Sequence, residues 1–136
     1  MLLRDVEVEL LTYCAENDIG VIPYSPMQSG LLTGKFTREY IEGLPENDWR
    51  RNTRPFKEPC LTANLDFVEK LRPIAARYSR PMGQLAIAWA LRRPEITAVI
   101  VGARRPSQIE ESAPAGDWVL DSALLAELDA LLAILT

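Results

Sequence analysis

The sequence contains no histidine among its 136 residues. This absence excludes the catalytic triads that use histidine, most catalytic zinc sites and any imidazole general acid or base. An enzyme that relied on this chain alone would have to work without imidazole.

Several other common signals are missing. The two cysteines, Cys14 and Cys60, form no CxxC pair, and we interpret them as reduced thiols of a cytoplasmic protein. No apolar stretch is long enough to span a bilayer, and the first ten residues lack the build of a signal peptide. A formal net charge of −4 argues against a nucleic-acid-binding protein. Neither GxGxxG nor GxxxxGKS/T occurs, which excludes the Rossmann and P-loop motifs. We therefore expect neither a membrane nor a nucleic acid as partner.

The composition that is present, 48% hydrophobic and 25% charged, is that of a soluble globular domain. Apolar residues at helical spacing predict helices over 5–17 with Asp5 as cap, over 65–78, over 81–93, from Pro106 and from Asp121. Short apolar runs predict two buried strands over 19–24 and 97–101. Between them, residues 28–64 are predicted as one long connection that is mobile or functional.

This alternation of strands and helices predicts the α/β class with parallel strands. Only two strands are predicted, however, and two parallel strands cannot form a stable sheet by themselves. The chain is therefore expected to be part of a larger assembly.

Groups able to bind a ligand follow both predicted strands, where α/β proteins place their ligand sites. The first strand leads into YSPMQSGLLTGKF, which offers an aromatic ring, hydroxyls, a glycine and Lys35. The second leads into GARRPS, where Arg104 and the start of a helix would suit a phosphate. On residue types alone, either stretch could equally be a solvated turn.

Taken together, IGVIPYSPMQSGLLTGKF, QLAIAWALRRPEITAVIVGA and TAVIVGARRPSQIEES resemble the aldo-keto reductase family over nearly the whole chain. The resemblance implies a partial TIM (β/α)8 barrel, with strands 7 and 8 and their flanking helices, completed by self-association. It also implies a single C-terminal half-barrel domain over 1–136, in which residues 28–64 cover the cofactor.

The resemblance implies NADPH as cofactor. Tyr24 matches the residue that packs beside the nicotinamide, and Glu111 matches the residue near the adenine amine. Arg104 matches the residue that binds the 2′-phosphate, and Gln108 matches a further contact there. Ser112 replaces the usual asparagine beside the adenine. The remaining matched positions are Ser25, Met27, Ser29, Gly30, Leu31 and Lys35 near the pyrophosphate, and Gly102 and Ala103 in the 2′-phosphate turn.

The family's catalytic Asp, Tyr, Lys and His come from early strands, so the resemblance implies that this chain lacks that tetrad and is inactive alone. Three alternatives remain open at this stage. The chain could be a truncated reductase that keeps its NADPH site, an inert homodimeric interaction module, or one half of a split reductase completed by a separate N-terminal half. A small aldehyde or ketone is the implied substrate of a complete enzyme.

Overall fold

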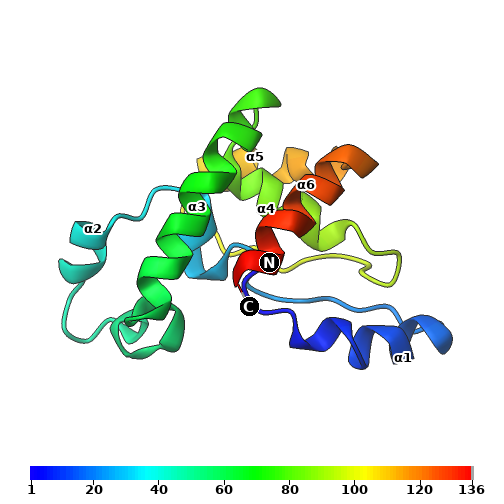
Figure 1. Ribbon diagram of the computed structural model, residues 1–136, viewed down its shortest axis with the longest axis horizontal. Coiled ribbons are helices and arrows are strands. Elements are labelled where there is room, and N and C mark those ends of the chain that lie inside the picture. The colour runs from blue at the N-terminus through cyan, green and yellow to red at the C-terminus, as the bar shows by residue number, and fades with distance from the viewer. Residues whose placement is uncertain (136) are drawn as a thin grey trace.

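Helices dominate the described part of the chain, residues 1–135 of a computed structural model (Figure 1). The α-helices are α1 (Leu10–Glu16), α2 (Arg38–Glu42), α3 (Cys60–Arg77), α4 (Met82–Leu91), α5 (Pro106–Ser112) and α6 (Ser122–Leu132). Short 3-10 helices lie between them, namely η1 (Asp5–Glu7), η2 (Gln28–Thr33), η3 (Trp49–Asn52), η4 (Arg54–Phe56), η5 (Ala113–Asp117) and η6 (Ala133–Leu135). No helix within residues 1–135 is both long enough and apolar enough to cross a membrane.

The four later helices confirm the sequence prediction, but the first does not. Residues 5–17 divide into η1 and α1, and Asp5 caps neither of them: the N-cap residues are Arg4 and Glu9, without side-chain capping bonds. At α6 the expected cap is present, since the Asp121 carboxylate accepts a hydrogen bond of 2.8 Å from the Leu124 amide.

The predicted α/β class, with a partial TIM barrel built on two strands, is wrong for residues 1–135. The two extended segments pair only through isolated parallel bridges, Val21 with Ile96 and Tyr24 with Ile100. The bridged residues are three positions apart on the first segment and four positions apart on the second, so the register shifts by one residue between them. Pro23 also offers no amide donor inside this short pairing. Consecutive pairs therefore do not accumulate into a sheet, and no self-associated barrel follows from this structure.

Helix α4 occupies the centre of the main core. All eight residues from Met82 to Trp89 are buried, whereas the sequence pattern predicted one apolar face. The helix contacts α3, α5, η2 and η5, which together cover its sides. Leu71 of α3 and Leu124, Leu128 and Leu132 of α6 belong to the same apolar cluster. Figure 1 shows α3, α4 and α6 grouped together, while α1 lies at the edge of the molecule.

The long connection over 28–64 is folded onto a second, smaller apolar cluster. It contains η2, α2, η3, η4 and the first turn of α3 rather than irregular chain alone. Its cluster residues are Leu31, Ile41, Leu44, Phe56 and Leu61. Thr37 caps α2, because its side chain accepts a hydrogen bond from the Tyr40 amide. Mobility of this segment stays a prediction.

We expect Leu128→Ala to lower the free energy of unfolding by about 2–5 kcal/mol, because it removes a fully buried side chain between α6 and the main core. Urea denaturation followed by tryptophan fluorescence measures this change. Val119→Ala is the matched control, since Val119 is 89% exposed and its loss should change stability by less than about 0.5 kcal/mol. Equal losses in the two variants would contradict the assignment of α6 to the core.

Candidate cofactor-binding site

The segment that follows the first extended stretch has an unusual backbone. Ser25, Gln28 and Ser29 have φ angles of 54°, 47° and 55°, in the left-handed region that costs a residue with a side chain about 1–2 kcal/mol. Gly30 follows with φ 105°. An added Cβ there would lie 2.7 Å from the Phe36 ring. Such strained backbone persists only where packing fixes it, and it is commonly found at ligand sites.

Two apolar side chains anchor this segment to the protein. Leu31 is fully buried in the second cluster, and Met27 packs against the main core. Both were predicted to be near the cofactor pyrophosphate. Because Leu31 has no exposed side chain, it can contribute to a binding surface only through its backbone.

The turn that follows the second extended stretch is open to solvent. Gly102, Ala103, Arg104 and Gln108 are exposed. The Gln108 Oε1 accepts hydrogen bonds from the amides of Arg104 (2.6 Å) and Arg105 (3.2 Å). Gln108 therefore occupies two backbone amides that precede α5 in this conformation. The side chains of Arg104 and Arg105 are both exposed, so two cationic groups lie at this turn.

Lys35 and Glu111 join the two candidate segments directly. The Lys35 Nζ lies 3.0 Å from one carboxylate oxygen of Glu111 and 3.2 Å from the other. These residues are separated by 76 positions in the sequence and were assigned to the pyrophosphate and to the adenine of one dinucleotide. The ion pair brings the segment after the first extended stretch into contact with the last turn of α5.

A second charged pair lies in the long connection. The Arg50 Nε donates a 2.9 Å hydrogen bond to Asp48. This contact is the main cause that lowers the pKa of the Asp48 carboxyl to about 2, and the positive charge of Arg104 makes a smaller contribution in the same direction. Asp48 therefore lies within electrostatic reach of Arg104. Neither Asp48 nor Arg50 was predicted as a site residue, since both lie in a stretch without apolar periodicity.

The structure also locates the remaining predicted residues. Tyr24 is 79% exposed, and its backbone pairs with Ile100. Ser25 is exposed, and Ser29 and Ser112 are half-buried. The contacts join Lys35 with Glu111 and Gln108 with Arg104, but they do not link Tyr24 or Ser25 to either pair.

The buried side-chain amide of Gln84, which contacts α5, was not predicted from the sequence. The Gln84 Nε2 donates a 2.6 Å hydrogen bond to the Glu111 carbonyl, and its Oε1 accepts one of 3.1 Å from Arg80. A lone glutamine inside the apolar run MGQLAIAWAL is the signal that could have identified it, because buried amides need partners.

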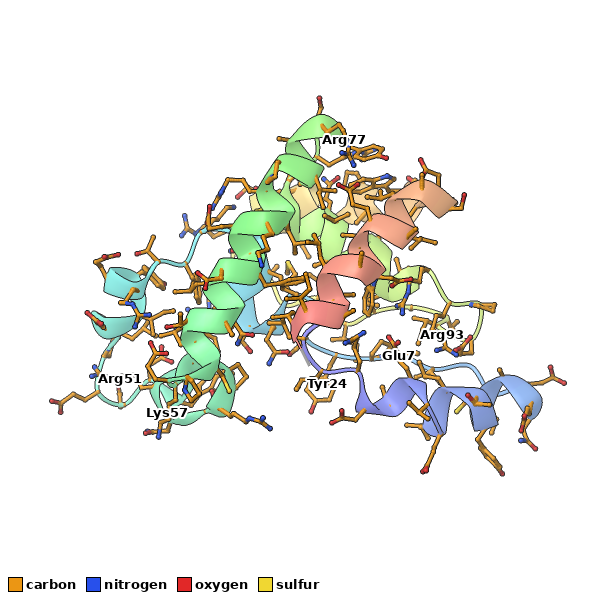
Figure 2. All side chains as sticks on the ribbon, in the orientation of Figure 1. Glu7, Tyr24, Arg51, Lys57, Arg77 and Arg93 are labelled. Carbon is orange, nitrogen blue, oxygen red and sulfur yellow. The ribbon has the colours of Figure 1, made fainter. Side chains whose placement is uncertain are left out.

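An apolar cavity of about 630 Å³ lies beside these segments. Its lining includes Val6 and Leu10 near the chain start, and Ile22 and Tyr24 of the first extended stretch. At one side of it, Arg92 pairs with Glu7 at 2.9 Å, and the Arg93 side chain extends toward Glu7 as well (Figure 2). The large apolar lining distinguishes this cavity from the charged contacts between Lys35 and Glu111.

Comparison with known proteins agrees with the resemblance noted in the sequence. The model of the Aldo/keto reductase family matches residues 1–133, and the chain belongs to this family. It is 37% identical over 112 residues to an NADH-specific methylglyoxal reductase of Escherichia coli, covering 82% of this chain and 33% of that protein. It is 35% identical over 121 residues to the aldo-keto reductase YhdN of Bacillus subtilis, covering 88% of this chain and 36% of that protein.

A solved structure supports the same relationship. A glycerol dehydrogenase from Gluconobacter oxydans superposes with a TM-score of 0.87 and 26% identity, covering 96% of this chain and 39% of that one. The chain thus spans little more than a third of the length of the relatives it matches. The likeness extends over 96% of this chain.

We expect Gly30→Ala to lower the free energy of unfolding by more than about 1 kcal/mol, because φ 105° and the nearby Phe36 ring both disfavour a Cβ. Urea denaturation measures the loss. Gly116→Ala is the control, since no atom lies within 4 Å of its added Cβ, and it should change stability by less than about 0.5 kcal/mol. Tolerance of alanine at position 30 would show that the strained turn is not retained in solution.

Proposed function

We propose that this chain supplies the NADPH-binding wall of an aldo-keto reductase. The observation that carries the proposal is the Lys35–Glu111 contact, since it joins two separate segments that were both assigned to the same cofactor. Family membership and the name of the Escherichia coli relative point to a nicotinamide cofactor in general. The choice of NADPH rests on the residues of this chain.

The residue types present fit such a cofactor. Lys35 offers an ammonium group for the pyrophosphate, and Arg104 offers a guanidinium for the 2′-phosphate. Glu111 offers a carboxylate that can accept a hydrogen bond from the adenine amine. Tyr24 offers an exposed ring for stacking beside the nicotinamide. For Lys35 to bind the pyrophosphate, its ammonium group must either leave Glu111 or contact both groups at once.

Selectivity for NADPH over NADH would come from Arg104. Its side chain forms none of the ion pairs found within residues 1–135, and the neighbouring backbone is fixed by Gln108. An exposed guanidinium on a fixed turn can bind a phosphate monoester with little rearrangement. The NADH-specific Escherichia coli relative shows that membership of the family alone does not decide this choice.

The bound nicotinamide would supply hydride to a carbonyl carbon, and a small aldehyde or ketone is the proposed substrate class. The residues of this chain would hold and orient the dinucleotide. With no histidine in the 136 residues, a histidine that orients the carbonyl cannot come from this sequence. We therefore expect the 136-residue polypeptide to bind NADPH without reducing a carbonyl.

The apolar cavity supports a proposed partner surface, which we assign to further aldo-keto reductase sequence. Val21 and Pro23 direct backbone carbonyls toward the second segment, accepting from Thr97 and Ile100 at 3.0 and 2.9 Å. The intervening peptide groups of Ile22 therefore point to the opposite side, where another extended segment could pair. The relatives carry almost two thirds of their length outside the matched region, which provides such segments.

We expect Arg104→Ala to raise the Kd for NADPH by about 10- to 100-fold, the usual effect of losing charge-assisted hydrogen bonds. The Kd for NADH should change by less than about 3-fold, because NADH has no 2′-phosphate. Titration calorimetry with both nucleotides measures this. Arg105→Ala is the matched control and should leave the ratio nearly unchanged. Absence of NADPH binding by the wild-type chain, or equal loss for both nucleotides, would overturn the proposed function.

We expect the chain to associate with a polypeptide carrying the first two thirds of the Bacillus subtilis relative, and Ile22→Lys to abolish that association by placing a charge beside the apolar cavity. Sedimentation velocity on the separate and mixed polypeptides measures it. Val119→Lys, on an exposed residue outside the cavity lining, should leave association intact. A homodimer of the chain that Ile22→Lys disrupts would assign the surface to a second copy instead.

A further inference from the structure

Gln84 is the one polar side chain among the buried residues of α4, Met82 to Trp89. Only 6% of the residue is exposed, and its neighbours Gly83 and Leu85 are buried as well. Burying an amide without partners costs free energy, so the position needs hydrogen bonds at both ends of the amide. Arg80 satisfies the oxygen and the Glu111 carbonyl accepts from the nitrogen. The side chain is therefore held in one orientation.

The carbonyl that Gln84 binds belongs to the last turn of α5. The last four carbonyls of a helix have no partner within the helix, and Glu111 is one of these residues in Pro106–Ser112. Helix α5 has seven residues, and none of them is buried. With no buried side chain to fix it, α5 depends on contacts such as this one for its position against α4.

Further contacts continue on both sides of this hydrogen bond. Arg80 lies over the Trp118 ring at 5.5 Å, and Trp118 packs against Tyr78 at 5.7 Å. On the other side, the Glu111 carboxylate pairs with Lys35. The glutamine thus connects an aromatic and cationic cluster near the end of α3 with the two residues assigned to the dinucleotide.

We propose that Gln84 is a positioning residue for the adenine end of the cofactor, acting through the backbone of Glu111. This inference rests on the proposed function. By binding the Glu111 carbonyl, Gln84 holds the backbone from which the Glu111 side chain extends. The same hydrogen bond orients the adjacent Ser112. The consequence is specific: the chain should distinguish adenine from a base without the 6-amino group only while Gln84 donates its hydrogen bond.

The test compares the Kd for NADPH with the Kd for its reduced hypoxanthine analogue, in which an oxygen replaces the 6-amino group. We expect the wild-type chain to prefer NADPH by about 10-fold, the effect of one hydrogen bond to a charged acceptor. Gln84→Met removes both hydrogen bonds, and Gln84→Glu keeps a partner for Arg80 but loses the donor to Glu111. Both variants should reduce the preference to about 3-fold or less.

The controls separate positioning from general stability. Leu85→Met changes the next residue of α4 at similar volume and should keep the 10-fold preference. Glu111→Met removes the acceptor and should lose the preference itself, and adding Gln84→Met to it should cause no further loss. Thermal melting of every variant identifies any that do not fold, and Gln84→Glu then serves in place of Gln84→Met.

The outcomes distinguish this inference from the proposed function. If the wild-type chain does not bind NADPH, both fail. If it binds NADPH but shows no preference between the two bases, or if both Gln84 variants keep the wild-type preference, the proposed function stands and the role of Gln84 is overturned.

Discussion

The burial of Met82 to Trp89 in α4 is the constraint on which the other elements depend. A helix that is mostly apolar around its circumference must be covered on all sides, and an isolated α4 would expose that surface to water. Its cover comes from α3, α5, η2 and η5. Two of these covering elements, η2 and α5, carry some of the residues assigned to the cofactor, and most of the others lie in the segments next to them. The candidate site is therefore formed where two pieces of the cover meet, and the packing around α4 sets its geometry.

This dependence also explains how strained backbone can persist at the site. Ser25, Gln28 and Ser29 adopt a positive φ around the start of η2, although serine and glutamine have no special preference for it. Each costs free energy locally, but Leu31 and Leu32 bury their side chains completely in the two clusters at the same turn. Burial of two leucine side chains contributes about 3–6 kcal/mol, enough to offset that local cost. Local conformation is here determined by packing.

The positions of the later helices could be predicted from sequence because apolar spacing and Asp121 define them locally. The sheet could not, because a parallel pair needs neighbouring strands and an unshifted register, and neither is encoded in an apolar run such as 97–101. Among the site residues, exposure of Tyr24 and Arg104 agrees with their residue types. The burial of Leu31 and the role of Gln84 depend on which elements cover α4, and this long-range information is absent from a local pattern.

Preference between the two nicotinamide cofactors depends on charge more than on shape, because they differ by one phosphate. In the proposed site, the Arg104 guanidinium would favour that phosphate, and the Asp48 carboxylate, which senses the charge of Arg104, would oppose it. Arg50 is hydrogen-bonded to Asp48 and compensates its charge, which would reduce this opposition. Under the proposed function, Asp48 and Arg50 of the long connection would therefore influence cofactor choice without touching the nucleotide. Relatives that share the same helices can differ in cofactor if this balance of charges changes.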